Sequence, residues 1–237
     1  MKTFQDWCID TIVHILKNRK SYRGTLRDQG YVYSIDAIVK HYAGMYYCKL
    51  PNVAQKGKEH VNLWWDHMSQ DRREVMFKSV MMSSAARKIA TEKNLTVKRA
   101  KEKLHWEHIV PCAKVIKALS VLEDISVDGV RKCFAHNKLV LITKDEQSYL
   151  DGKGSRFENK DLEFVRENFS ETDYALAKEY LNEWPKDCGT ALLRLARLSN
   201  KGVVFCTYDD EQELAPKEWL NYLNDSKYLL GTCSFGR

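Results

Sequence analysis

The chain has few residues that interrupt regular structure: its 237 residues include only 4 prolines and 11 glycines. Long flexible linkers are therefore not expected, and no internal repeat or low-complexity tract is present. No apolar run approaches the roughly 18 residues that a membrane helix needs, so we expect no membrane span. With 44% hydrophobic and 30% charged residues, the composition indicates a globular chain of one or two domains.

Paired cysteine motifs are also absent. The 7 cysteines are scattered and odd in number, and none forms a Cys-x-x-Cys pair. This distribution argues against a disulfide framework and against a four-cysteine zinc site. Asp6 and Asp10 interrupt the apolar start of the chain, so it is not a secretory signal peptide. We therefore expect a cytoplasmic protein whose thiols are reduced.

Apolar periodicity predicts an α+β fold that is mainly helical. Helical spacing covers residues 1–20, 113–134 and 156–185, and residues 71–94 read as one long methionine-rich helix. Branched residues predict a short strand over 137–143 and another near 201–208. We divide the chain into a helical N-terminal region (1–97), a core (98–155) and a helical or mixed C-terminal region (156–237).

Positive charge is concentrated just before the core. The net charge is +6, and residues 87–103 hold seven basic side chains against only Glu92 and Glu102. Most charge runs are solvated helix faces, but this run leads directly into a polar cluster. Its position favours binding of nucleic-acid phosphates. The side chains nearest to that cluster are Lys98, Arg99, Lys101 and Lys103.

The polar cluster lies in the stretch LHWEHIVP, residues 104–111. His105, Glu107 and His108 fall within four positions of a predicted strand, and His105 and Glu107 are expected to point to the same side. A second strand opens at Asn137, and Thr143-x-x-Glu146 predicts a capping box that begins a helix. An acid or amide from each end of this unit would form a pocket for one divalent cation, for which oxygen ligands favour Mg or Mn.

The segment Glu107-His108-Ile109-Val110-Pro111, followed by HNKLVLITKDEQ at 136–147, resembles the HNH, or ββα-metal, nuclease motif. The resemblance covers roughly residues 104–152. It implies a ββα-metal core with a helical insertion at 113–134. Within that core, Glu107 would be a metal ligand, and His108 the general base for a water that attacks a phosphodiester. Asn137 would hold the His108 segment by hydrogen bonds.

The position that the family fills with Asn or His in the helix has two candidates. Counting nine residues from Asn137 gives Glu146, whereas the strand-to-helix rhythm of the motif gives Gln147. Glu146 is also the capping-box residue. His105 would contact a metal ligand without binding the metal itself, although an ordinary surface histidine is as good an explanation. His136 would take the role of Asn137 if the register shifted by one residue.

The resemblance implies a divalent-metal-dependent endonuclease that hydrolyses DNA, most simply duplex DNA, as restriction, phage and defence enzymes do. Cutting both strands would need a homodimer or two successive events. A non-catalytic nucleic-acid-binding protein is the first alternative. A helical interaction protein that binds no metal is the second. The sequence leaves open the choice between DNA and RNA and any recognition sequence.

Overall fold

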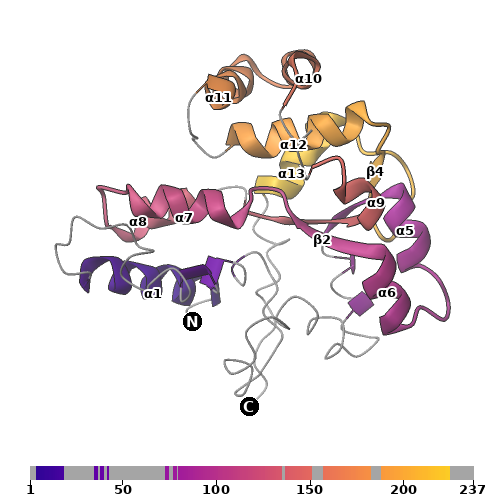
Figure 1. The fold of residues 1–237 in the computed structure, drawn as a ribbon, viewed down its shortest axis with the longest axis horizontal. Coiled ribbons are helices and arrows are strands. Elements are labelled where there is room, and N and C mark those ends of the chain that lie inside the picture. The colour runs from indigo at the N-terminus through magenta and orange to yellow at the C-terminus, as the bar shows by residue number, and fades with distance from the viewer. Residues whose placement is uncertain are drawn as a thin grey trace.

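A computed structural model describes residues 4–18, 35–36, 38–39, 42, 73–74, 77–78, 80–134, 137–150, 157–182 and 188–224. Over these residues the chain is α+β and mainly helical, as predicted, with one small mixed sheet at its centre (Figure 1). No helix in these ranges is both long and apolar enough to cross a membrane.

The sheet contains β1 (Met81–Ser83), β2 (Leu104–His108), β3 (Leu139–Thr143) and β4 (Phe205–Cys206), in the order β2-β3-β1-β4. β2 runs antiparallel to β3, β3 runs parallel to β1, and β1 runs antiparallel to β4. Strands from before, within and after the predicted core therefore share one sheet. The division at residues 98 and 155 stays a prediction about sequence regions.

Both faces of the β2–β3 pair are covered, which explains the composition of the strands. Leu139 and Leu141 of β3 pack on one face, and Val140 and Ile142 pack on the other. A strand that is buried on both faces reads as a continuous apolar run, as LVLIT does. β2 alternates instead: its Leu104 and Trp106 share the cluster of Leu139 and Leu141.

Helices from distant parts of the chain cover the two faces. The α6 face, which carries Leu104 and Trp106, packs against α5 (Ser84–Ala90) and α6 (Val97–Lys103). The α12 face, which carries Val140 and Ile142, belongs to the larger core that includes α12 (Cys188–Asn200). Figure 1 shows the remaining helices around this core. They are α1 (Phe4–Asn18), α7 (Cys112–Ser120), α8 (Val127–Cys133), α10 (Asn159–Asn168), α11 (Glu171–Asn182) and α13 (Pro216–Asn224).

The prediction of one long helix over 71–94 is wrong. Met81–Ser83 form a strand between β3 and β4, and all three residues are buried. Pairing on both edges and burial outweigh the helix preference of methionine. Helix α5 begins only after Ser83, whose side chain accepts a hydrogen bond from the Ala86 amide. The basic residues of 87–103 are divided mainly between α5 and α6. Helix α6 has its own N-cap at Thr96.

The other periodicity predictions agree with the described structure to within a few residues. The strand predicted over 137–143 is β3, which begins at Leu139, so Asn137 precedes this strand and does not open it. Helices α7 and α8 occupy the predicted insertion at 113–134, and α10 and α11 occupy the described part of 156–185. The strand expected near 201–208 is present as the short β4.

Candidate functional site

The site is built on the antiparallel pair of strands β2 and β3, which α7 and α8 connect, and on the short helix α9 (Lys144–Gln147) that follows β3. Leu104 lies opposite Thr143, where α9 begins, and Glu107 lies opposite Val140. These two pairs are three residues apart along the strands, or about 10 Å at roughly 3.3 Å per residue. Glu107 and the start of α9 therefore lie toward opposite ends of the β2–β3 strand pair.

The carboxylate of Glu107 is buried between the guanidinium of Arg194 and the ring of His105. Its side chain is on the α12 face, where Oε1 accepts a hydrogen bond from Nη2 of Arg194 on α12 at 2.5 Å. Its Oε2 lies 3.1 Å from Nε2 of His105. His105 and Glu107 thus lie on the same side of β2, as strand alternation predicts.

The electrostatics of this cluster keep Glu107 ionised. Burial by itself would raise the pKa of this carboxyl. The hydrogen bond from His105 and the nearby Arg194, His105 and His108 outweigh burial, so the pKa lies below its ordinary value of 4.5. Glu107 therefore carries a full negative charge at neutral pH, as a metal ligand must.

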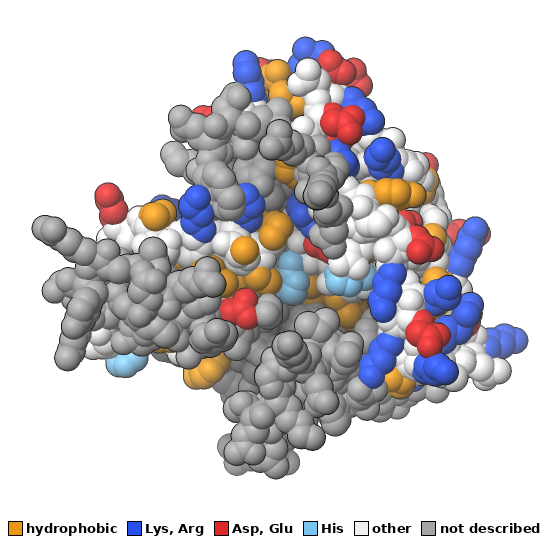
Figure 2. Space-filling model, viewed as in Figure 1, with side chains coloured by type: hydrophobic (Ala, Val, Ile, Leu, Met, Phe, Trp, Pro, Cys, Tyr) orange, Lys and Arg blue, Asp and Glu red, His pale blue; other side chains and the backbone are white. Residues whose placement is uncertain are grey.

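His108 ends β2 and is half-buried. The following residue, Ile109, donates its backbone N–H to the carbonyl of Lys138 at 3.0 Å, which fixes the chain just after the histidine. Figure 2 shows histidine side chains at the surface near the middle of this face. Since His108 is only half-buried, its side chain keeps partial access to solvent at the end of the strand.

Asn137 is fully buried, and its contacts differ from those that the resemblance implies. Its Nδ2 donates to the carbonyl of Val39 at 3.3 Å rather than to the His108 segment. Its Oδ1 has no hydrogen-bond partner among the residues that the structure describes. The tie to the segment after His108 comes instead from the backbone of Lys138. His136 lies outside the described residues.

Glu146 holds the start of α9. Its Oε2 accepts hydrogen bonds from the Thr143 amide at 2.7 Å and from the Ser83 hydroxyl at 2.6 Å. Thr143 in turn accepts from the Glu146 amide, which completes the predicted capping box. The Oε2 atom of Glu146 therefore links α9 to β3 and β1 by hydrogen bonds.

Gln147, the other candidate on α9, is half-buried. Helix α12 contacts both the residues that follow Gln147 and the Glu107 carboxylate. Arg197 on that helix donates to the Tyr149 carbonyl at 2.7 Å, and Arg194, about one turn earlier, binds Glu107. The residues that follow Gln147 and the Glu107 carboxylate thus lie along the same side of α12.

The donor chemistry of the site suits one hard cation but not a closed metal cage. In the described parts of the chain, no three His, Cys, Asp or Glu side chains come together around a common point. A carboxylate offers about four lone-pair sites, and the contacts with Arg194 and His105 use two of those on Glu107. Mg²⁺ is often held by one or two carboxylates, with water and substrate oxygens completing its shell.

The predicted phosphate-binding side chains gather on and beside α6, and Figure 2 shows Lys and Arg side chains along this edge of the molecule. Lys98, Arg99 and Lys103 are exposed, and Lys101 is half-buried. Arg99 is bound to both carboxylate oxygens of Glu92, at 2.5 and 2.6 Å. Its charge is therefore largely compensated, and the lysines of this group provide most of the field toward solvent.

Arg194 is the residue at this site that sequence reasoning missed. It and Arg197 interrupt an otherwise apolar stretch of α12, and both are buried. Buried arginines are rare unless an acid or a carbonyl compensates them. Two of them at helical spacing in an apolar helix indicate buried acceptors elsewhere in the chain, although not which ones.

No family model, curated protein or solved structure matches this chain. The resemblance to HNH nucleases therefore depends on the motif residues themselves.

Proposed function

We propose that this protein is a divalent-metal-dependent endonuclease of the HNH type that hydrolyses phosphodiester bonds in duplex DNA. The main support is the ionised Glu107 beside His108 at the end of β2, which pairs antiparallel with β3, the strand that a capped helix follows. This order of strand, strand and helix is the one that the motif predicts. A restriction, phage or defence enzyme is the kind of nuclease that the proposal describes.

In this proposal, Glu107 would be a ligand of Mg or Mn, and Gln147 on the helix that follows β3 would be the second protein ligand. The bound cation would neutralise negative charge on the phosphate and on the leaving oxygen. His108 would accept the proton of the attacking water, because an imidazole titrates near neutral pH. His105 would orient the Glu107 carboxylate through the contact already described.

The basic side chains of α6 would hold the substrate. Lys98 and Lys103 are exposed and lie on the helix that leads directly into β2. Contacts between lysines and phosphates position a duplex without reading its sequence. The proposal therefore assigns backbone binding to α6 and leaves double-strand cleavage to a homodimer or to two successive cuts.

One observation favours the alternative of a non-catalytic nucleic-acid-binding protein. Arg194 already compensates Glu107, and a cation at the same carboxylate would lie close to that guanidinium. If this repulsion prevents metal binding, the basic surface would still bind DNA. The alternative therefore predicts duplex binding that is independent of Mg or Mn.

Cleavage of supercoiled plasmid tests the proposal, with Mg, Mn or a chelator and with mapping of the product ends. The change His108→Ala should lower the rate about 10²- to 10⁴-fold, as expected for loss of a general base. His14→Ala is the matched control, because His14 is exposed on α1 and contacts only Asn18 of the same helix among the contacts seen.

The outcomes separate the candidate functions. Cleavage by His108→Ala at the wild-type rate contradicts the proposed base. Duplex binding without cleavage under any metal supports the non-catalytic alternative. Absence of both binding and cleavage supports a protein-interaction role.

A further inference from the structure

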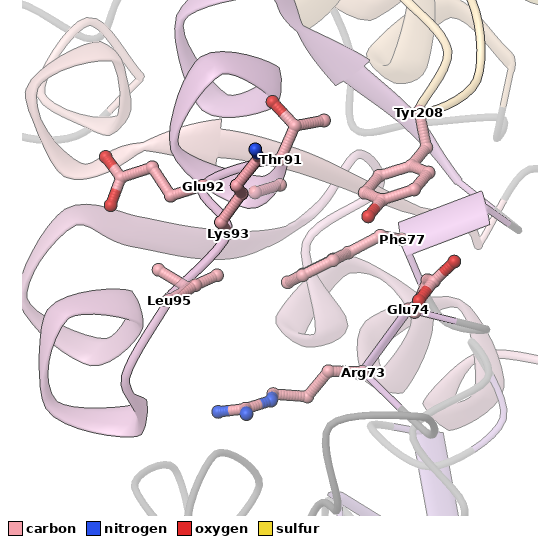
Figure 3. Close-up of a pocket in the computed structure, with 9 residues that line it drawn as sticks. Arg73, Glu74, Phe77, Thr91, Glu92, Lys93, Leu95 and Tyr208 are labelled. Atoms are coloured by element: carbon pink, nitrogen blue, oxygen red, sulfur yellow. The ribbon is translucent and has the colours of Figure 1, made fainter.

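A hollow of about 140 Å³ opens on the α6 side of the molecule, and neither Glu107 nor Arg194 lines it (Figure 3). Arg73, Glu74 and Phe77 line it from one side, and Lys93 and Leu95, in the turn between α5 and α6, line it from another. Tyr208, beyond β4, closes it. None of these residues belongs to the candidate nuclease site.

Arg73 is the unusual residue of this hollow. Its side chain is only 8% exposed, and its Nη1 is buried without a hydrogen-bond partner in the described part of the chain. A guanidinium presents five donors and no acceptor, and leaving a buried, charged donor unpaired is costly. Arg73 therefore needs an acceptor that the described residues do not supply.

The carboxylates at the rim are bound to other partners. Glu74 is 2.9 Å from Lys78, and Glu92 is bound to Arg99. Lys93 is exposed at the edge of the hollow and adds a second positive charge. The field inside the hollow is therefore positive and favours an anion.

The wall of the hollow is a stack of aromatic rings. The ring of Phe77 lies between those of Trp106 and Tyr208, with centroids 5.9 and 5.8 Å away and interplanar angles of 24°. Rigid apolar walls exclude water and strengthen the interaction of a charged donor with its acceptor. The stack also links the hollow to the nuclease strand, because Trp106 lies two residues before His108.

We propose that this hollow binds one phosphate group of the DNA strand that crosses α6. Its volume of about 140 Å³ is well below the roughly 300–1,000 Å³ of a typical ligand pocket, which favours a small anion such as one phosphate group. Arg73 makes the direct contact, with its planar fork matched to phosphate oxygens. This assignment of the phosphate to DNA rests on the proposed nuclease function; the anion site itself does not.

The experiment compares Arg73→Gln with Arg131→Gln, an identical change at an exposed arginine on α8 that pairs with Asp6 and Asp128. Fluorescence anisotropy with a labelled duplex, in calcium and at several salt concentrations, reports binding without cleavage. We expect Arg73→Gln to weaken duplex binding about tenfold or more and to flatten the salt slope by about 0.9. Arg131→Gln should leave both unchanged.

A second measurement separates DNA from a free anion. Inorganic phosphate should raise the melting temperature of the wild type above that in chloride at matched ionic strength, and Arg73→Gln should lose this increase. If phosphate stabilises the wild type but Arg73→Gln binds duplex normally, the site takes a free phosphate and the DNA assignment is overturned. If neither readout responds to Arg73→Gln, the anion site itself is overturned.

Lys93→Glu guards against a variant that fails to fold, because Lys93 is exposed. Reversing its charge at the rim should reduce both phosphate stabilisation and duplex affinity, and unchanged values would count against the site. Plasmid cleavage keeps the two proposals distinguishable. A wild type that responds to phosphate through Arg73 but never cuts DNA retains the anion site and loses the nuclease.

Discussion

Glu107 and Glu146 lie toward opposite ends of the same pair of antiparallel strands, β2 and β3, and they are held in different ways. Glu146 accepts hydrogen bonds from neutral donors, the Thr143 amide and the Ser83 hydroxyl. Glu107 is buried against the guanidinium of Arg194 and the ring of His105. The first carboxylate caps a helix, whereas the second belongs to a buried charge cluster.

The two carboxylates differ in which group is left without a partner when Glu146 or Arg194 is removed. Without Glu146, α9 loses a cap, and the Thr143 amide and the buried Ser83 hydroxyl, which are both neutral, lose an acceptor. Without Arg194, Glu107 keeps its charge in a site from which water is largely excluded. Buried charges that lose their partner are among the most destabilising changes known in proteins. The Glu107 end should therefore be far more sensitive to substitution than the Glu146 end.

The largest effect is expected for Arg194→Met. This change should lower the free energy of unfolding by about 3–5 kcal/mol, because it leaves Glu107 buried without its strongest partner. Urea unfolding at neutral pH measures it. Arg131→Met, at an exposed pair, should cost less than about 1 kcal/mol. Adding Glu107→Gln to Arg194→Met should restore part of the loss, and a simple sum of the two losses would contradict the buried pair.

The next effect concerns α9. Glu146→Ala should cost about 1 kcal/mol of stability as a lost cap and should leave the metal requirement of cleavage unchanged. Gln147→Ala should leave stability nearly unchanged and raise the required Mg or Mn concentration about tenfold. Metal titrations of plasmid cleavage and urea unfolding of both variants measure the two effects. The reverse pattern would assign the metal to Glu146.

The smallest effect is the pH dependence of the Glu107 pair. Because the pKa of Glu107 is lower in the folded chain than its ordinary 4.5, the unfolded chain takes up this proton first as the pH falls. The contribution of the pair is therefore complete above pH 4.5 and is lost as the pH falls through the folded-state pKa.

Urea midpoints of the wild type and of Glu107→Gln, measured from neutral pH downward, check this dependence. The stability difference between them should shrink below pH 4.5, because glutamine does not titrate. A difference that stays constant over this range would mean that the charge of Glu107 contributes nothing to stability.

The two ends of the β2–β3 strand pair also differ in how much of their structure the sequence predicts. The capping box depends on residues three positions apart, and the shared side of His105 and Glu107 depends on a two-residue period, so local patterns predict both. The pair of Glu107 with Arg194 spans 87 residues, and no local pattern specifies it.

The same limit explains the error over residues 71–94. Met81–Ser83 have no strong strand preference and become a strand only because β3 and β4, far away in the sequence, flank them. Asn137 is a third case. A motif assigns it to the His108 segment, but its amide binds Val39, which comes from outside the motif.

The distance between Glu107 and Arg194 also sets an order of events during synthesis. A ribosome adds roughly 5–20 residues per second, so a separation of 87 residues corresponds to about 4 to 17 seconds. Throughout that interval the nascent chain contains Glu107 but not the arginine that compensates its burial. Strands β2 and β3 can pair earlier, but the charged cluster on their α12 face is completed only when α12 emerges and docks.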